Sequence, residues 1–473
     1  MNSIAKHNSV PFNQKVAFGI GMLANQMFPA AMNIFLIVFV EGLGLPVLMW
    51  GALMFLPRTL DCITDPLMGF ISDNTKSRWG KRRPYIFIGA FIIGISFCIM
   101  WQIFREDPIH YTFWYFLLWS FVFYIGLTIF SVPYVALGYE MSEDFHERTS
   151  IMAIAQWIGQ WAWVIAPWFW VVMYDQGWFE SPDAATRELA IWVGLTCMVF
   201  AVVPAIFIKS KSTVNADLEE ISFGNLGVIF KKMFTQIVQA FSSAPFRKLC
   251  FSTFLIFNSF NTVASFSFLI ILHYLFNGDE SLIGLWPTLF GSVMALGTTF
   301  IVIPTVKAMA DKMGKQKAFM VTQVISIFGY IILWFLFVPG KPYLFLFALP
   351  FISFGIGGLF TLMMSMTPDV IDLDELQRGE RREGIFGAVY WFMVKMGFAF
   401  TGLLAGLILT FVGFDSELEK QATESVNGLR MAFSIIPIVA TLISLWIMKS
   451  YDIDEARANE IREELEKKKG AAS

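Results

Sequence analysis

The sequence contains little charge, few cysteines and few histidines. Charged residues make up 15% of the 473 positions and apolar residues 56%, whereas a soluble globular protein is about 25% charged. Four cysteines, all widely spaced within apolar runs, exclude a zinc-type cluster and argue against disulfides: Cys62, Cys98, Cys197 and Cys250. The four histidines are scattered and follow no metal-ligand spacing. We therefore expect no catalytic residues, no cofactor and no nucleic-acid partner.

Long apolar runs are what the sequence has in abundance. Runs of about 20 residues, the length that crosses a bilayer, recur along the chain. The polar start, Met1–Gln14, leads into the first run without a cleavable signal pattern. We predict an all-α integral membrane protein with twelve transmembrane helices in two six-helix halves. The predicted spans lie near residues 15–40, 48–72, 84–104, 111–140, 150–174, 188–208, 248–276, 282–307, 317–338, 342–366, 385–413 and 428–448.

Lysine and arginine are distributed unevenly between the predicted loops. Alternate loops carry 19 of them, against 5 in the loops between. By the positive-inside rule, both termini and the basic loops are cytoplasmic, in a cell (inner) membrane. The predicted organisation is an N-terminal half at 1–208, a linker at 209–247 with an amphipathic surface helix at 223–241, a C-terminal half at 248–448 and a cytoplasmic tail at 449–473. We expect the tail to be a solvated helical extension and the protein to be monomeric.

The same loop pattern occurs once in each half. Asp73, then Gly80 and the bases Arg82 and Arg83, follow the second span. After the eighth span the order returns as Asp311, Gly314 and Lys315. Such repetition at corresponding positions is typical of transporters built from parallel repeats. The pattern resembles the major facilitator superfamily, whose halves rock about a central site.

A cluster of charge lies in the middle of the second predicted span. Asp61 and Asp65 are four residues apart, so they share one helix face about 6 Å apart along the axis. Arg58 precedes them by one turn, and Thr64 adds a hydroxyl group. Two carboxylates in a low-dielectric environment repel each other unless a cation or proton joins them. The pattern predicts a site for H⁺ or Na⁺, and a purely structural ion network around Arg58 is the alternative.

Lys395 is the second basic residue deep in a predicted span. Its depth in the eleventh span is near mid-membrane, and a charge there is costly unless it has a partner. We expect Lys395 to reach the two acids and join the charge network, with a snorkelling lysine as the alternative.

The charged motif resembles a specific family, the glycoside–pentoside–hexuronide:cation symporters. The resemblance rests on Asp61 to Gly69, Asp73 and Ser77 to Pro84 in the first half, and on Asp369 to Glu375 and Lys395 to Gly397 in the second. It implies that Asp61, Thr64 and Asp65 bind the coupling cation and that Lys395 is linked to this site. Ser131 stands where the family has a fourth-span Asp, and its substitution favours H⁺ over Na⁺.

Polar and aromatic side chains in four spans form the candidate solute site. Sugar sites combine hydrogen-bonding amides with an aromatic face. These candidates are Asn25 and Gln26 in the first span, Ser131 in the fourth, Gln156, Gln160 and Trp163 in the fifth, and Tyr390 and Trp391 in the eleventh. The alternative for the two fifth-span glutamines is an interhelix hydrogen bond.

The sequence predicts cation-coupled symport of a sugar, glycoside or hexuronide-like solute by alternating access. Lysophospholipid-like or other amphiphilic cargo is the alternative within transport. A sensor would need a signalling domain, and neither the central segment nor the tail is long enough to form one.

Overall fold

A computed structural model describes residues 10–142, 145–175, 177–210, 212–214, 238–379, 383–416 and 420–472, together with positions 227, 231, 235 and 418. Regular structure within these residues is entirely helical. The predicted amphipathic helix at 223–241 falls mostly outside them. Because each helix satisfies its own backbone hydrogen bonds, an apolar helical chain of this kind suits a bilayer.

Among the described residues, eleven helical segments are long and apolar enough to cross a membrane. A twelfth, predicted near 150–174, consists of α6 (Phe145–Ile165), the 3₁₀ turn η1 (Ala166–Trp168) and α7 (Phe169–Tyr174). The predicted all-helical membrane fold is therefore confirmed. The eleven segments comprise α1 (Phe12–Phe35) with α2 (Val38–Glu41), α3 (Val47–Asp73), α4 (Arg83–Met100), α5 (Ile109–Glu140), α8 (Pro182–Phe207), α10 (Ala244–Ile270) with η3 (Ile271–Leu275), α11 (Trp286–Gly297) with η5 (Thr298–Val302) and α12 (Ile303–Met313), α13 (Lys315–Leu336), η6 (Pro342–Phe347) with α14 (Leu349–Gly358), η7 (Leu359–Met363) and α15 (Met364–Arg378), α16 (Glu383–Phe411), and α17 (Thr423–Lys449).

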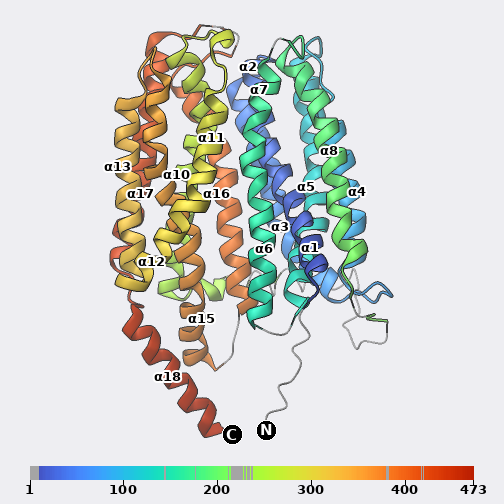
Figure 1. The fold of residues 1–473 in the computed structure, drawn as a ribbon, viewed down its shortest axis with the longest axis vertical. Coiled ribbons are helices and arrows are strands. Elements are labelled where there is room, and N and C mark those ends of the chain that lie inside the picture. The colour runs from blue at the N-terminus through green and yellow to red at the C-terminus, as the bar shows by residue number, and fades with distance from the viewer. Residues whose placement is uncertain are drawn as a thin grey trace. The chain divides into compact units, whose positions relative to one another are not determined.

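The chain forms two compact units. Unit 1 comprises Met1–Leu45 and Leu60–Leu226, and unit 2 comprises Pro46–Thr59 and Gly227–Ser473. In unit 1, α4 packs against α5 and α8, and α1 packs against α6 and α8. In unit 2, α10 packs against α16 and α17, and α13 packs against α14 and α17 (Figure 1).

The first half of α3 belongs to unit 2, although the sequence places all of residues 1–208 in one half. Glycines explain its packing on α16. A methyl group at Gly51 would lie 2.9 Å from the carbonyl oxygen of Gly402 and 3.0 Å from Cα of Gly406. Only glycine allows the two backbones to approach so closely.

Close backbone packing also shapes unit 1. A methyl group at Gly89 of α4 would lie 2.6 Å from the backbone nitrogen of Phe130 on α5. Aromatic rings fill the space beside this contact: Phe97 packs 5.3 Å from Phe28 and 5.6 Å from Phe123 between ring centroids. This packing fixes α5 against its neighbours and so positions the polar groups that α5 carries.

The C-terminal helix α18 (Glu455–Ala472) is docked against unit 2, so the predicted fully solvated extension is wrong for one of its faces. Ile461 is completely buried and Leu465 nearly so. Arg462 donates a 2.7 Å hydrogen bond to Asp369 of α15. The Nζ of Lys468 donates to the carbonyl of Leu376 at 3.0 Å.

Candidate functional site

The predicted cation site is built on α3. This helix continues from Val47 to Asp73 without interruption, so the spacing of Asp61 and Asp65 does place both carboxylates along one face. Asp61 is 5% exposed, and Asp65 is half-buried. A carboxylate buried this deeply needs polar partners, because an uncompensated charge in the interior is expensive.

Thr128 of α5 supplies those partners and lies at the centre of the site. Its Oγ1 is 2.9 Å from Oδ1 of Asp61 and 3.0 Å from Oδ1 of Asp65. The hydroxyl oxygen of Thr64 lies 2.9 Å from the same atom. Thr128 is 2% exposed, so these contacts are shielded from water. The four oxygen atoms come from two helices of unit 1.

The number of hydrogens limits how these contacts can be satisfied. A hydroxyl group carries one hydrogen, and an ionised carboxylate carries none. Three oxygen–oxygen contacts of 2.9–3.0 Å meet at Thr128, but Thr64 and Thr128 together supply two hydrogens. The third contact is favourable when one of the acids carries a proton or when a cation lies among the oxygens. The arrangement can therefore take up one positive charge.

A multivalent metal centre finds no support among the described residues, which contain no group of three or more His, Cys, Asp or Glu side chains placed to hold a metal ion. Two carboxylates and two hydroxyls are a donor set for a proton or a hard monovalent cation rather than for a transition metal. Thr128 is not among the residues that the sequence predicts for this site. In the sequence it is distinguished only by its position one turn before Ser131, on the same face of the fourth span.

The two basic residues of the predicted network lie in unit 2. Arg58 is 7% exposed, and its guanidinium carbon lies 4.6 Å from the centre of the Phe398 ring on α16. A cation over an aromatic face is stabilised by the ring quadrupole, more strongly where water is excluded. Lys395 lies on α16 one turn before Phe398 and is half-buried. Both residues have polar or electrostatic interactions.

Three of the predicted solute-binding side chains meet between α1 and α6. The Nε1 of Trp163 donates a 2.6 Å hydrogen bond to Oε1 of Gln26. The Nε2 of Gln26 lies 3.5 Å from Oε1 of Gln156, which is exposed. The indole therefore orients the amide of Gln26, and Gln156 leaves its own amide nitrogen available to a solute.

The remaining predicted solute-binding residues are placed separately. Asn25 contacts the sulfur of Met22 at 3.9 Å, and Gln160 and Ser131 are half-buried in unit 1. On α16, Trp391 is 45% exposed. Tyr390 is 2% exposed and belongs to the apolar core of unit 2, where its hydroxyl has no hydrogen-bond partner in the described part of the chain. Tyr390 is thus buried in this conformation, and its part in solute binding stays a prediction.

The loop motif of unit 1 forms a compact ion network. Arg82 pairs with Asp73 and donates to Glu140 at 3.1 Å, and Lys81 lies 3.0 Å from the same Glu140 carboxylate. Gly80 has a φ of 83°, a conformation that glycine adopts without strain. Arg83 donates instead to the carbonyl of Ala205 at 2.6 Å, at the end of α8.

The corresponding loop of unit 2 repeats the turn but not the ion pair. Gly314 has a φ of 82°, matching Gly80 in the first motif. Lys315 donates to Asp369 of α15 at 2.6 Å, and Asp311 is exposed. The two loops therefore share a glycine of positive φ and differ in length and in which acid pairs with the base.

Comparison with known proteins agrees with this fold. The sequence profile described as MFS/sugar transport protein matches residues 17–455. An uncharacterized symporter, YnaJ of Bacillus subtilis, is 25% identical and covers 96% of this chain and 94% of its own. A glucuronide carrier protein homolog of Escherichia coli is 24% identical, covering 96% and 95%. The inward-open structure of the xylose transporter XylE from E. coli shares the fold, with a TM-score of 0.62, 14% identity and coverage of 95% and 99%.

The profile spans nearly the whole chain, and the relatives it groups are transporters rather than enzymes. The chain belongs to the MFS/sugar transport family and, within it, to the glycoside–pentoside–hexuronide:cation symporters.

Proposed function

We propose that this chain is a proton-coupled symporter of a sugar, glycoside or hexuronide. The observation that carries cation coupling is the set of three oxygen contacts at Thr128, which two hydroxyl hydrogens cannot satisfy. The choice of a proton over Na⁺ rests on Ser131, which stands where the family has a further carboxylate. A proton shared by Asp61 and Asp65 supplies the missing hydrogen.

Proton binding changes the charge of the site by one unit. At an effective dielectric of about 20, charges about 4 Å apart interact by roughly 4 kcal/mol. A difference of about 1.4 kcal/mol already shifts a two-state equilibrium tenfold. Protonation of Asp61 or Asp65 is therefore strong enough to determine which conformation the transporter prefers. We expect Arg58 and Lys395 to be the basic groups whose interactions change with this charge.

The solute class follows from the groups between α1 and α6. Gln26 and Gln156 offer amide donors and acceptors, and Trp163 offers an aromatic face beside them. Sugars present hydroxyl groups and an apolar ring face to such a surface. A glucuronide carrier homolog is among the relatives that match nearly the whole chain. These observations favour sugars and their glycosides or hexuronides over amphiphilic cargo.

We propose an inner-membrane orientation with both termini in the cytoplasm. The positive-inside rule gives this direction, since the loops predicted to be cytoplasmic carry 19 of the lysines and arginines against 5 opposite. Solute and proton then enter together from outside.

The test is solute-driven proton movement in proteoliposomes of the purified protein. A panel containing a glucuronide, a xyloside and a galactoside is added to vesicles in sodium-free buffer with a pH-sensitive dye outside. Protein-free vesicles are the control. We expect at least one solute to alkalinise the medium. Solute uptake that requires Na⁺ and moves no protons would overturn the proton assignment, and no uptake of any sugar would overturn the solute class.

A further inference from the structure

A groove on the surface of unit 1 lies between α4 and α8. Its volume is about 280 Å³, and it is lined by Phe91 of α4 and by six residues of α8 between Met198 and Phe207. Every lining residue is apolar. Several of these side chains are largely exposed: Val199 is 60% exposed and Phe207 63%. The groove extends about 13 Å along α8, at 1.5 Å per residue, and ends where the helix ends.

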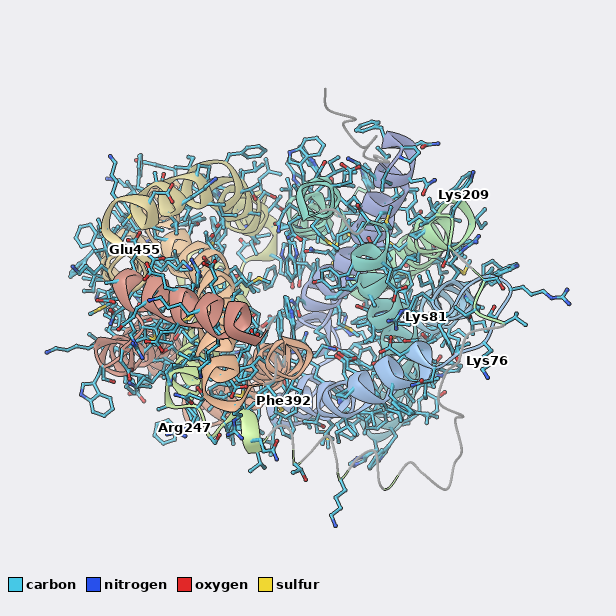
Figure 2. The ribbon with its side chains drawn as sticks, turned by 90° about the horizontal axis from the view of Figure 1, so that it is seen from below. Lys76, Lys81, Lys209, Arg247, Phe392 and Glu455 are labelled. Atoms are coloured by element: carbon cyan, nitrogen blue, oxygen red, sulfur yellow. The ribbon has the colours of Figure 1, made fainter. Side chains whose placement is uncertain are left out.

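Basic side chains gather where the groove ends. Lys209 follows α8 directly, and Lys76 and Arg78 lie in the loop between α3 and α4. Figure 2 views the chain from below and shows Lys76 and Lys209 toward the outer side of unit 1. Two hydrogen bonds hold these segments together: the backbone N–H of Thr213 donates to the carbonyl of Ser77 at 3.1 Å, and the backbone N–H of Ser77 donates to the hydroxyl oxygen of Thr213 at 3.1 Å.

Within the part of the chain that the structure describes, these bases differ from those of the loop motif because no carboxylate lies within ion-pair distance of them. Lys81 and Arg82 are paired with Asp73 and Glu140. Lys76, Arg78 and Lys209 are exposed and make no ion pair with any residue that the structure describes.

Trp79 marks the level of the membrane surface at this point. Its ring is 49% exposed and lies 5.8 Å from the guanidinium carbon of Arg83. Tryptophan is enriched where lipid headgroups meet the hydrocarbon layer. Two guanidinium nitrogens of Arg83 donate hydrogen bonds to the carbonyls of Ala205 and Ile206. These bonds hold the charge of Arg83 beside the end of the groove, which Ile206 lines.

The geometry points to a binding site for an anionic phospholipid, with one acyl chain in the α4–α8 groove and the headgroup phosphate among Lys76, Arg78, Arg83 and Lys209. An apolar slot that ends beside a cluster of exposed cations is complementary to a molecule that is apolar along its length and negative at one end. Anionic lipids of the cytoplasmic leaflet attract such basic clusters by about 1 kcal/mol per lysine or arginine. Placement in that leaflet rests on the proposed orientation, whereas the binding itself does not.

Native mass spectrometry of the purified protein with equimolar phosphatidylglycerol and phosphatidylcholine tests the site. We expect the parent protein to retain phosphatidylglycerol preferentially. Arg78→Gln with Lys209→Gln should weaken that preference by about fivefold for each charge removed. The matched control is Lys307→Gln with Lys317→Gln, which removes the same charge from exposed positions of unit 2 and should leave the preference unchanged.

The groove is tested separately from the charge. Val202→Trp fills it and should lower retention of phosphatidylglycerol, while Leu195→Trp, exposed on α8 outside the groove, should not. The assignment would be overturned if the two double variants lost the preference for phosphatidylglycerol equally, or if Val202→Trp retained as much phosphatidylglycerol as the parent protein. The measurement uses neither solute nor gradient, so its failure is independent of any failure in transport.

Discussion

The hydroxyl oxygen of Thr128 on α5 lies 3.0 Å from a carboxylate oxygen of Asp65 on α3 and 2.9 Å from one of Asp61. The single hydroxyl hydrogen can serve only one of these acids at a time. A change in protonation of either acid therefore changes the hydrogen bond that the other receives. We therefore expect Thr128 to couple the two carboxylates and to transmit the change from α3 to α5.

Replacing Thr128 by valine keeps the side-chain shape and removes the hydroxyl group. A buried hydrogen bond to a charged group contributes about 1.5–3 kcal/mol, so losing it should reduce proton-driven accumulation by roughly tenfold or more and move its pH profile. Thr128→Ser, which keeps the hydroxyl, should retain most of the activity. The measurement is uptake against pH at matched expression. Equal activity and the same pH profile in Thr128→Val would show that the hydroxyl is a packing group only.

Gln26→Leu tests the solute site. Gln26 accepts a 2.6 Å hydrogen bond from Trp163, and leucine can neither orient that ring nor bind a sugar hydroxyl. We expect the KM for solute to rise about tenfold, since one hydrogen bond is worth about 1 kcal/mol or more. The control is Gln377→Leu, the same substitution at an exposed position of α15 in unit 2. If the two variants raise KM equally, the amide of Gln26 has no special role.

The docking of α18 is tested by truncating its buried face. Ile461 is completely buried, and Ile461→Ala should lower the free energy of unfolding by about 2–4 kcal/mol if the whole of unit 2 unfolds together. Glu463→Ala, at an exposed position of the same helix, should have little effect. Thermal melting of the purified variants measures both. Identical melting temperatures would mean that α18 does not contribute to the stability of unit 2.

The predicted orientation is checked by labelling single cysteines from outside intact cells, in a background without the four native ones. Lys307→Cys lies in a loop predicted to be cytoplasmic, and Arg105→Cys lies in a loop on the opposite side. A membrane-impermeant thiol reagent should modify the cysteine at 105 and leave the one at 307 unmodified. The reverse pattern would contradict the orientation.

The fold and the acidic pair could be predicted because both follow from local spacing. Apolar runs of span length define membrane helices, and a four-residue spacing places Asp61 and Asp65 on one face whatever else the helix contacts. Thr128 could not be predicted from the residues alone, because its contact with Asp65 spans 63 residues and depends on how α3 packs against α5.

The C-terminal helix shows a different limit. Ala458, Ile461 and Leu465 follow the spacing of an amphipathic helix and are buried in unit 2. The many charged residues around these three side chains make the apolar face hard to recognise in the sequence, and the burial of only three side chains is not apparent from composition. The fully buried position of Tyr390 was hidden for a similar reason, because an aromatic residue in a membrane helix has the same sequence signature in a core and in a cavity.

The most direct test of proton coupling compares two transport modes of Asp65→Asn at matched expression. The asparagine keeps the size of the side chain and one oxygen but cannot bind the coupling proton. Vesicles with an imposed pH gradient report accumulation, and de-energised vesicles loaded with solute report exchange. We predict that Asp65→Asn loses accumulation of solute while exchange of solute persists in part. Accumulation equal to that of the parent protein would contradict the assignment of Asp65 to the coupling site.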